Sequence, residues 1–187
     1  MSWIRTYRGY EFNYENIENN NIDIHDIAHG LSNMCRFAGH TKYFYSVAQH
    51  SVACADKAYD ISQDRNFALC ALLHDSSEAY LMDIPRPLKP LLKNYTEIET
   101  KIQNLINKKL SVDSMYDTYK DRIKEIDNKM LLTEAEQLIT KGTEGFTMGN
   151  ENGEKSYKDI SVSYMTSAAA EKLFLNRYVF YKCGIQM

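Results

Sequence analysis

The pair His74-Asp75 is the feature of this sequence that points most directly to chemistry. It follows the apolar run of residues 67–73, so a hydrophobic segment carries an imidazole and a carboxylate together toward the interior. Burial of such groups costs free energy unless a charged partner compensates them. His50 lies upstream among small apolar residues, and Asp127 lies downstream. Two nitrogen and two oxygen donors suit one divalent cation that keeps open positions for water and substrate.

Asp127 has the clearest local pattern of the four, because it interrupts an apolar helix face. Its neighbours on that face are Ile123, Met130 and Leu131. A lone carboxylate in a buried stripe is costly unless it meets a cation or several hydrogen-bond donors. The alternative is an aspartate that pairs with an arginine or caps a neighbouring helix. The other three donors favour the metal.

The remaining histidines give weaker signals. His50 taken alone also fits a histidine of the hydrophobic core, so its assignment depends on the other donors. His25 and His29 are one helical turn apart and could chelate, but a solvated or core role is the favoured interpretation. His40 follows a glycine and is a candidate for the lining of a pocket.

The elements that must position these side chains follow from the apolar spacing. Residues 3–14 alternate around Arg8-Gly9 and predict a short β-hairpin. Apolar residues at i, i+3 and i+4 predict helices elsewhere, with the segment of residues 67–73 in a buried central one. Asp23 and Ser167 are the expected caps of the first and last helices, and Thr96 with Glu99 fits a capping box. The predicted helices span about 23–34, 45–59, 64–73, 96–110, 117–140 and 167–182.

The class is therefore all-α with a small N-terminal hairpin. All three prolines, Pro85, Pro87 and Pro90, fall in one segment behind the His-Asp pair. Each proline fixes its own φ and disfavours the helical conformation of the residue before it. This predicts a stiff loop that forms one wall of the site. A stretch rich in Gly and Asn at about 142–156 predicts a mobile surface loop.

Length and charge limit the function classes. At 187 residues the chain is expected to form one domain over 1–187, with the metal-site core at about 23–140 and the last helix docked on it. The net charge is −3, from 22 basic and 25 acidic residues. No global positive field therefore attracts nucleic acid or an anionic membrane.

Cysteine usage and the N-terminus indicate a reduced, cytoplasmic protein. The N-terminal residues lack the apolar core of a signal peptide, and no run approaches membrane-spanning length. Three of the four cysteines fall in apolar helical stretches and are expected to be buried free thiols. None has Cys-x-x-Cys spacing; the four are Cys35, Cys54, Cys70 and Cys183.

The order of the four donors, a His, then a His-Asp pair, then an Asp, resembles the HD-domain superfamily of metal-dependent phosphohydrolases. Within it the chain is similar to small bacterial 5′-deoxynucleotidases, and more so to small phage enzymes that remove the whole triphosphate from dATP. The resemblance covers about residues 1–140 and, more weakly, the last helix. The segments that carry it are 26–31, 35–40, 45–52, 74–80 and 83–89.

The resemblance implies an HD-domain helical bundle and a metal centre. Its pattern makes His50, His74, Asp75 and Asp127 the ligands of one divalent ion, with Co²⁺, Zn²⁺, Mn²⁺ and Mg²⁺ as candidates. Glu78 matches the catalytic carboxylate that handles the nucleophilic water. It stands four residues after the second histidine, so a continuing helix would place both on one face; the alternative is an exposed helix glutamate.

The resemblance also assigns substrate contacts by position. Arg36 matches a residue that grips phosphate, and a guanidinium fork suits non-bridging oxygens. Phe37 stands where the nucleotidases commonly have a Trp and keeps a stacking surface. Asp83 matches the residue that reads the sugar 3′-hydroxyl and disfavours a 2′-hydroxyl. Lys89 matches a phosphate contact, with a surface lysine as the alternative.

These roles together imply hydrolysis of dATP, with dADP and dAMP as further candidates, to deoxyadenosine. The alternative is a general 5′-deoxynucleotidase that acts on dNMPs, and a non-catalytic nucleotide-binding protein is a remote one. No histidine follows His74; two-metal HD oxygenases need further histidines there, so a single metal is expected. The relatives imply a homo-oligomer, a dimer or a hexamer, in the cytoplasm, or in the host cytoplasm if a phage encodes it.

Overall fold

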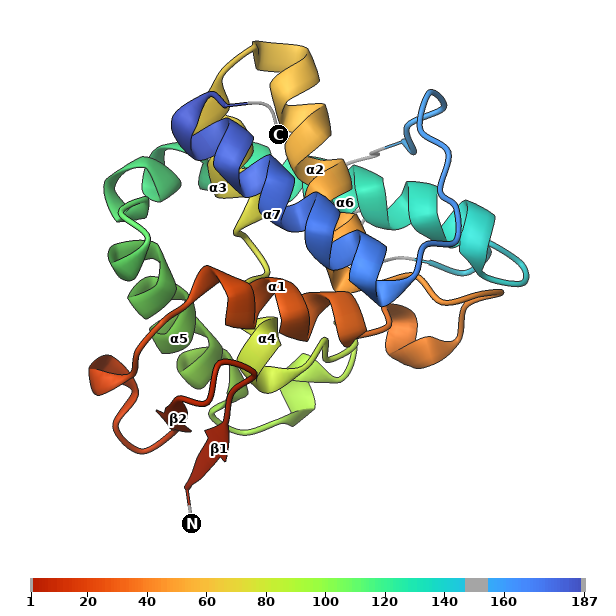
Figure 1. The fold of residues 1–187 in the computed structure, drawn as a ribbon. Coiled ribbons are helices and arrows are strands. Elements are labelled where there is room, and N and C mark those ends of the chain that lie inside the picture. Colours follow the sequence, from red (N-terminus) through yellow and green to blue (C-terminus); the bar gives the residue numbers. More distant parts are fainter. Residues whose placement is uncertain (1, 147–154, 186–187) are drawn as a thin grey trace.

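The computed structural model describes residues 2–146 and 155–185, which are mostly helical. Seven α-helices and one two-stranded antiparallel sheet make up these residues (Figure 1). The strands are β1 (Trp3–Arg5) and β2 (Glu11–Asn13). The helices are α1 (Ile24–Asn33), α2 (Val47–Ser62), α3 (Arg65–Leu72), α4 (Glu78–Leu81), α5 (Tyr95–Lys109), α6 (Asp113–Leu138) and α7 (Ser167–Cys183), and three 3₁₀ turns lie at Ile17–Asn19, Phe37–Gly39 and Lys89–Leu91.

The N-terminal hairpin packs one face on the helices. Ile4 lies opposite Phe12 in the antiparallel register, and Phe12 is fully buried whereas Ile4 is 41% exposed. The chain reverses through Gly9, whose φ of +86° carries no Cβ penalty in glycine. The predicted hairpin is confirmed, although Tyr7 and Tyr10 lie outside the strands.

Helices α2 and α3 form the centre of the core. All six residues of α3 from 67 to 72 are buried, as expected for a helix that is apolar nearly all round. Helix α7 lies across α1, α2 and α3 (Figure 1). Its Phe174 is fully buried, and Arg177 donates two hydrogen bonds of 2.6 and 3.0 Å to the Asp56 carboxylate. Helix α7 therefore packs on the three helices of the core.

Side-chain caps fix where several helices begin. The Asp23 carboxylate caps α1 as predicted. Ser46 and Gln49 form a capping box at the start of α2, which places the following histidine in the first turn. The cap of α7 is Thr166, one residue before the predicted Ser167.

The predicted capping box of α5 is wrong. The helix begins at Tyr95, after Asn94 in a left-handed conformation (φ 63°), and no side chain caps it. Glu99, which was expected to reach back toward Thr96, instead accepts a hydrogen bond of 2.7 Å from Lys89 Nζ. A tertiary ion pair thus takes the carboxylate that a local cap would have used.

Two other predictions are modified by the structure. Helix α6 begins four residues before the predicted position 117 and ends at Leu138. The predicted mobile loop at 142–156 falls mainly on residues 147–154, which lie outside the described residues. Residues 142–145 form turns.

The cysteines divide into two groups. Cys54 and Cys70 are buried free thiols as predicted, but Cys35 is half-buried and Cys183 is exposed at the end of α7. Among the described residues, no helix combines the length and the apolarity that a bilayer crossing requires.

Candidate metal centre

The four predicted ligands come together between α2, α6 and the turn after α3. His50 Nε2 lies 3.5 Å from Asp75 Oδ2 and 3.4 Å from Asp127 Oδ1. His74 Nε2 lies 3.2 Å from the same oxygen of Asp75. Nitrogen and oxygen donors at ordinary bond lengths from one tetrahedral ion are about 3.4 Å apart. These three separations are close to that value, so each of the three pairs could share one metal ion.

Hydrogen bonds on the outer side of each imidazole prepare the inner nitrogen as a ligand. His74 Nδ1 lies 2.7 Å from the carbonyl oxygen of Ala71, which can only accept, so Nδ1 carries the proton. His50 Nδ1 lies 2.8 Å from Glu134 Oε1 in the same manner. In a neutral ring this leaves Nε2 with a free lone pair, the form that binds metal. Nε2 of His74 is buried and makes no hydrogen bond, although it lies close to the Asp75 carboxylate.

A sulfur atom also reaches this cluster. Donor atoms of His50, Cys54 and His74 all lie within 4.8 Å of one another, so the three side chains could hold a metal ion. From the sequence, Cys54 is predicted only as a buried core thiol.

Glu134 is a second residue whose role the sequence analysis missed. Its carboxylate is fully buried and accepts hydrogen bonds of 3.0 Å from Tyr45 Oη and from Arg36 Nε, besides that from His50. Burial opposes its ionisation, but His50 and Arg36 hold the pKa of Glu134 below its usual value. One carboxylate thus orients a candidate ligand and a candidate phosphate contact. It stands seven residues after Asp127 on α6, two turns along the same face, and this spacing was the available signal.

Asp127 divides its two oxygens between different partners. Oδ1 faces His50, whereas Oδ2 lies 3.0 Å from Arg86 Nη2 and 2.8 Å from Lys124 Nζ. Burial would raise the pKa of Asp127, but His50 and Lys124 outweigh it and hold this pKa well below the usual range. Asp127 therefore pairs with an arginine and also faces a candidate metal ligand, so both interpretations of this residue hold.

Glu78 reaches the site by a different route from the one predicted. Helix α3 ends at Leu72, a series of turns follows, and Glu78 opens the short helix α4, so no continuous helix joins it to the second histidine. Its side chain is nevertheless buried and lines the pocket. Burial, then the carboxylates of Asp75 and Asp83, raise the pKa of Glu78 well above its usual value. The alternative of an exposed helix glutamate is wrong.

A glycine sets how closely α4 approaches α1. A Cβ at Gly30 would lie 3.1 Å from the Cβ of Ala79, the residue after Glu78. Such contacts are tighter than ordinary van der Waals packing, so a side chain at position 30 would displace α4. The glycine therefore lets Ala79, the neighbour of Glu78, pack closely against α1.

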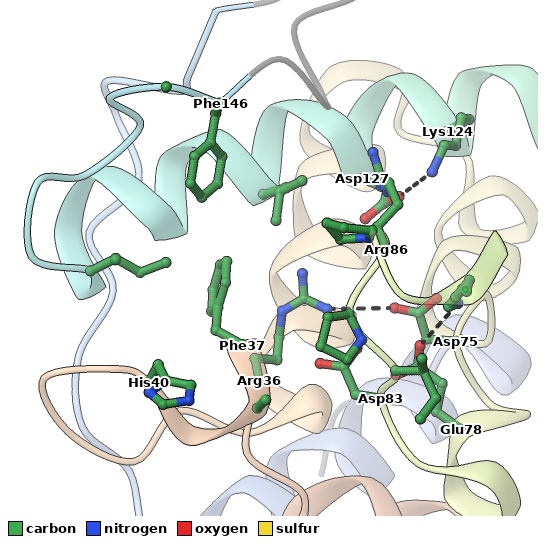
Figure 2. Close-up of a pocket in the computed structure, with 18 residues that line it drawn as sticks. Arg36, Phe37, His40, Asp75, Glu78, Asp83, Arg86, Lys124, Asp127 and Phe146 are labelled. Carbon is green, nitrogen blue, oxygen red and sulfur yellow. Dashed lines mark hydrogen bonds and ion pairs between the residues drawn. The ribbon is translucent and has the colours of Figure 1, made fainter. Parts of the chain in front are cut away.

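A pocket of about 700 Å³ opens beside the metal donors (Figure 2), within the range typical of small-molecule sites. Phe37, His40 and Phe146 lie at one end, and Asp75 and Asp127 at the other. Four carboxylates and four cations line it, so their formal charges cancel and one divalent ion would leave a net positive pocket. These residues are Asp75, Glu78, Asp83, Asp127, Arg36, Arg86, Lys89 and Lys124.

Three residues with a strained backbone lie next to two pocket residues in the chain. Phe37 and Ala38 have φ values of 55° and 51°, and Met82 has φ 78°, conformations that side-chain-bearing residues rarely adopt. Each costs about 1–3 kcal/mol and persists only where the surroundings enforce it, commonly at functional sites. The strained residues adjoin Arg36 and Asp83, two of the predicted substrate contacts.

Arg36 is held by carboxylates on several sides. It is buried, with Nε bound to Glu134 and Nη1 3.9 Å from Asp75 Oδ2. Burial alone would lower the pKa of Arg36, but the surrounding carboxylates, Glu134 first, raise it well above the usual value. Asp83 faces the same pocket, and burial raises the pKa of its carboxyl.

The other predicted residues divide between the pocket and the surface. Lys89 lines the pocket with Nζ 3.9 Å from Glu78 Oε1, in addition to its bond with Glu99. His40 also lines the pocket. His29 instead pairs with Glu171 on α7 at 3.0 Å, so it does not join the metal cluster.

Replacement of Glu134 by Gln should lower both stability and metal affinity. Arg36 would lose its nearest counter-ion while buried, and a broken buried ion pair typically costs about 3–5 kcal/mol. Loss of the partner of a metal-binding histidine typically costs about 10–100-fold in metal affinity. Denaturant unfolding and zinc titration measure the two effects, with Glu136→Gln on the exposed face of α6 as the control. Unchanged values in Glu134→Gln would show that this carboxylate orients neither residue.

Fold and site together define a helical protein with a buried candidate metal centre at the end of a charged pocket. The chain is 45% identical over 138 residues to the uncharacterized protein YfdR of Escherichia coli strain K12, covering 74% of this chain and 73% of the relative. It is 30% identical over 143 residues to an uncharacterized protein of Rhodobacter capsulatus, covering 73% of each. The chain therefore belongs to the YfdR family. No protein-family model matches it.

Proposed function

We propose that this protein is an HD-type, metal-dependent phosphohydrolase that hydrolyses dATP, and also dADP and dAMP, to deoxyadenosine. The observation that carries the proposal is the convergence of four metal donors with Glu78 and Arg36 on one pocket. A structural ion pair would not need a buried imidazole nitrogen without a hydrogen bond, a buried glutamate and a buried arginine at the same place.

The layout of the pocket supports a nucleotide as the ligand. Phe37 and Phe146 offer aromatic surfaces at the end away from the metal donors (Figure 2), and base stacking on such rings contributes about 1–3 kcal/mol. Asp83 lies between this end and the metal donors, where it can accept a hydrogen bond from a sugar hydroxyl. Arg36 stands next to the candidate metal centre, where the phosphate would lie.

The chain's own groups supply the remaining chemistry of hydrolysis. A divalent ion, when bound, polarises a phosphoryl oxygen and lowers the pKa of water. Glu78 would take the proton from the attacking water, and its buried position keeps competing solvent away. Arg36 and Lys89 would neutralise charge that develops on the phosphate oxygens. Cleavage at the α-phosphorus then releases the nucleoside.

Further cations favour a triphosphate over a monophosphate as the main substrate. Lys89 is the cation that the sequence predicts beyond the α-phosphate position, and the pocket also contains Arg86 and Lys124. Both side chains now pair with Asp127 Oδ2 and are 30% and 57% exposed, so they can turn toward an anion. Three cations beyond Arg36 match the additional charge of a triphosphate.

A substrate screen tests the proposal directly. Purified protein is incubated with each dNTP and each dNMP in the presence of Co²⁺, Mn²⁺, Zn²⁺ or Mg²⁺, and the released anion is identified by chromatography. We expect triphosphate and deoxyadenosine from dATP. Release of phosphate from dNMPs alone would instead support the general 5′-deoxynucleotidase. Stoichiometric nucleotide binding without any hydrolysis would support the non-catalytic alternative.

Asp83 should make the enzyme prefer deoxynucleotides. A ribose 2′-hydroxyl would crowd the slot beside Pro85 without a free partner, which costs about 1–3 kcal/mol for an unsatisfied polar group. That corresponds to about ten- to hundredfold slower cleavage of ATP than of dATP. Competition kinetics measure the ratio, which should shrink in Asp83→Asn and stay unchanged in Asp121→Asn on the exposed face of α6. Equal rates on ATP and dATP in the wild type would contradict both the role of Asp83 and the deoxynucleotide assignment.

A further inference from the structure

A second, smaller pocket of about 320 Å³ adjoins the candidate metal centre. It shares four lining residues with the larger pocket, namely Asp75, Lys89, Lys124 and Asp127. Both of these carboxylates and Lys124 lie at the end of the larger pocket away from Phe37 (Figure 2). The two pockets therefore meet at the candidate metal centre, and the smaller one continues from there between α5 and α6.

The smaller pocket offers hydrogen-bond donors that no described residue uses. Lys120 lines it one helical turn before Lys124 on α6, and its ammonium makes no hydrogen bond or ion pair with the described residues. The hydroxyl groups of Ser77 and Tyr116 line the same pocket and make no hydrogen bond within the described part of the chain. Ser77 is only 3% exposed. A buried hydroxyl without a partner costs free energy, so this side chain indicates a polar ligand in the pocket.

The charge of the smaller pocket suits an anion once a divalent ion is bound. Three carboxylates and three ammonium groups line it; they are Asp75, Glu99, Asp127, Lys89, Lys120 and Lys124. Two of the carboxylates belong to the candidate metal centre, and Glu99 already accepts a hydrogen bond of 2.7 Å from Lys89. A divalent ion would therefore leave this pocket with a net positive charge.

We propose that the smaller pocket binds the β- and γ-phosphates of a deoxynucleoside triphosphate, and that Lys120 pairs with the terminal phosphate. The inference rests on the proposed function and assigns a place to the part of the substrate that a monophosphate lacks. The aromatic end of the larger pocket, the metal centre and the smaller pocket follow one another in the order of base, α-phosphate and remaining phosphates. Ammonium and hydroxyl donors suit phosphate oxygens, and Lys89 and Lys124, which line both pockets, would contact the phosphates in between.

Kinetics on dATP and dAMP test the role of Lys120. In Lys120→Ala the ratio of kcat/KM for dATP to kcat/KM for dAMP should fall about tenfold, the effect of one lost hydrogen bond to a charged group. Lys120→Arg keeps the charge and should largely restore the ratio. The matched control is Lys172→Ala, which removes an exposed lysine of α7 and should behave as the wild type. An unchanged ratio in Lys120→Ala would overturn the subsite and leave the phosphohydrolase intact.

Binding of inorganic tripolyphosphate gives a second readout that needs no turnover. The metal-loaded protein is titrated calorimetrically with the magnesium complex of tripolyphosphate, and with inorganic phosphate for comparison. Lys120→Ala and Tyr116→Phe should each weaken tripolyphosphate binding more than phosphate binding. Tripolyphosphate binding that neither variant weakens would overturn the subsite. A wild type that binds tripolyphosphate through Lys120 but hydrolyses no deoxynucleotide would support the subsite and contradict the proposed function.

Discussion

Replacement of Asp127 by Asn is expected to abolish stoichiometric metal binding and, with it, turnover. The substitution keeps the size of the side chain but removes the negative charge that faces His50 at 3.4 Å. Loss of a group that only hydrogen-bonds to a metal ligand typically costs about 10–100-fold in metal affinity. Loss of a charged ligand itself should cost more. Metal content after dialysis and calorimetric titration with Zn²⁺ or Co²⁺ measure the effect.

The Asp127→Asn protein should still fold. The other partners of this carboxylate, Arg86 and Lys124, have partly exposed side chains, so each can be hydrated when the carboxylate is gone. Circular dichroism should therefore report an intact helical protein. Asp121→Asn makes the same chemical change on the exposed face of α6 and should leave metal binding unchanged. An Asp127→Asn protein that binds one ion per chain and turns over normally would remove Asp127 from the ligand set.

Replacement of Glu78 by Gln should separate catalysis from binding. The variant should hold metal and nucleotide but lose about 10²–10⁴-fold in turnover, the range for a positioned general acid or base. The reason is that an amide cannot take a proton from water, whereas the buried carboxylate of Glu78 faces the pocket and has one oxygen without a hydrogen-bond partner. Single-turnover kinetics with dATP and metal titration measure the two properties.

The matched control for Glu78 is Glu97→Gln on the exposed side of α5, where the carboxylate pairs with Lys101. It should behave as the wild type. Wild-type turnover in Glu78→Gln would show that Glu78 is a buried structural residue and not the catalytic one.

The residues of the centre were accessible to sequence reasoning to different degrees. Asp127 could be found because a carboxylate interrupts an apolar helix face, and the structure brings it to His50 as expected. Glu134 was missed although it lies two turns further along the same face, because its meaning depends on partners far away in the chain.

The elements show the same division between local and tertiary signals. The hairpin and the cap at Asp23 depend on neighbouring residues and were predicted correctly. The capping box at Thr96 is wrong because α5 already begins at Tyr95, and Glu99 binds Lys89 from another segment. Local spacing could not reveal that α3 ends before Glu78, since the chain that joins them consists of turns held by tertiary packing.

Hydrolysis of dATP in water that carries the heavy oxygen isotope tests the central claim most directly. The protein is first loaded with one metal ion per chain, and the products are then separated and weighed by mass spectrometry. Attack on the α-phosphorus by a water that Glu78 deprotonates predicts one heavy oxygen in the released triphosphate and none in deoxyadenosine. Metal-loaded protein that hydrolyses no deoxynucleotide, or that places the label in the nucleoside, would contradict the proposed phosphohydrolase.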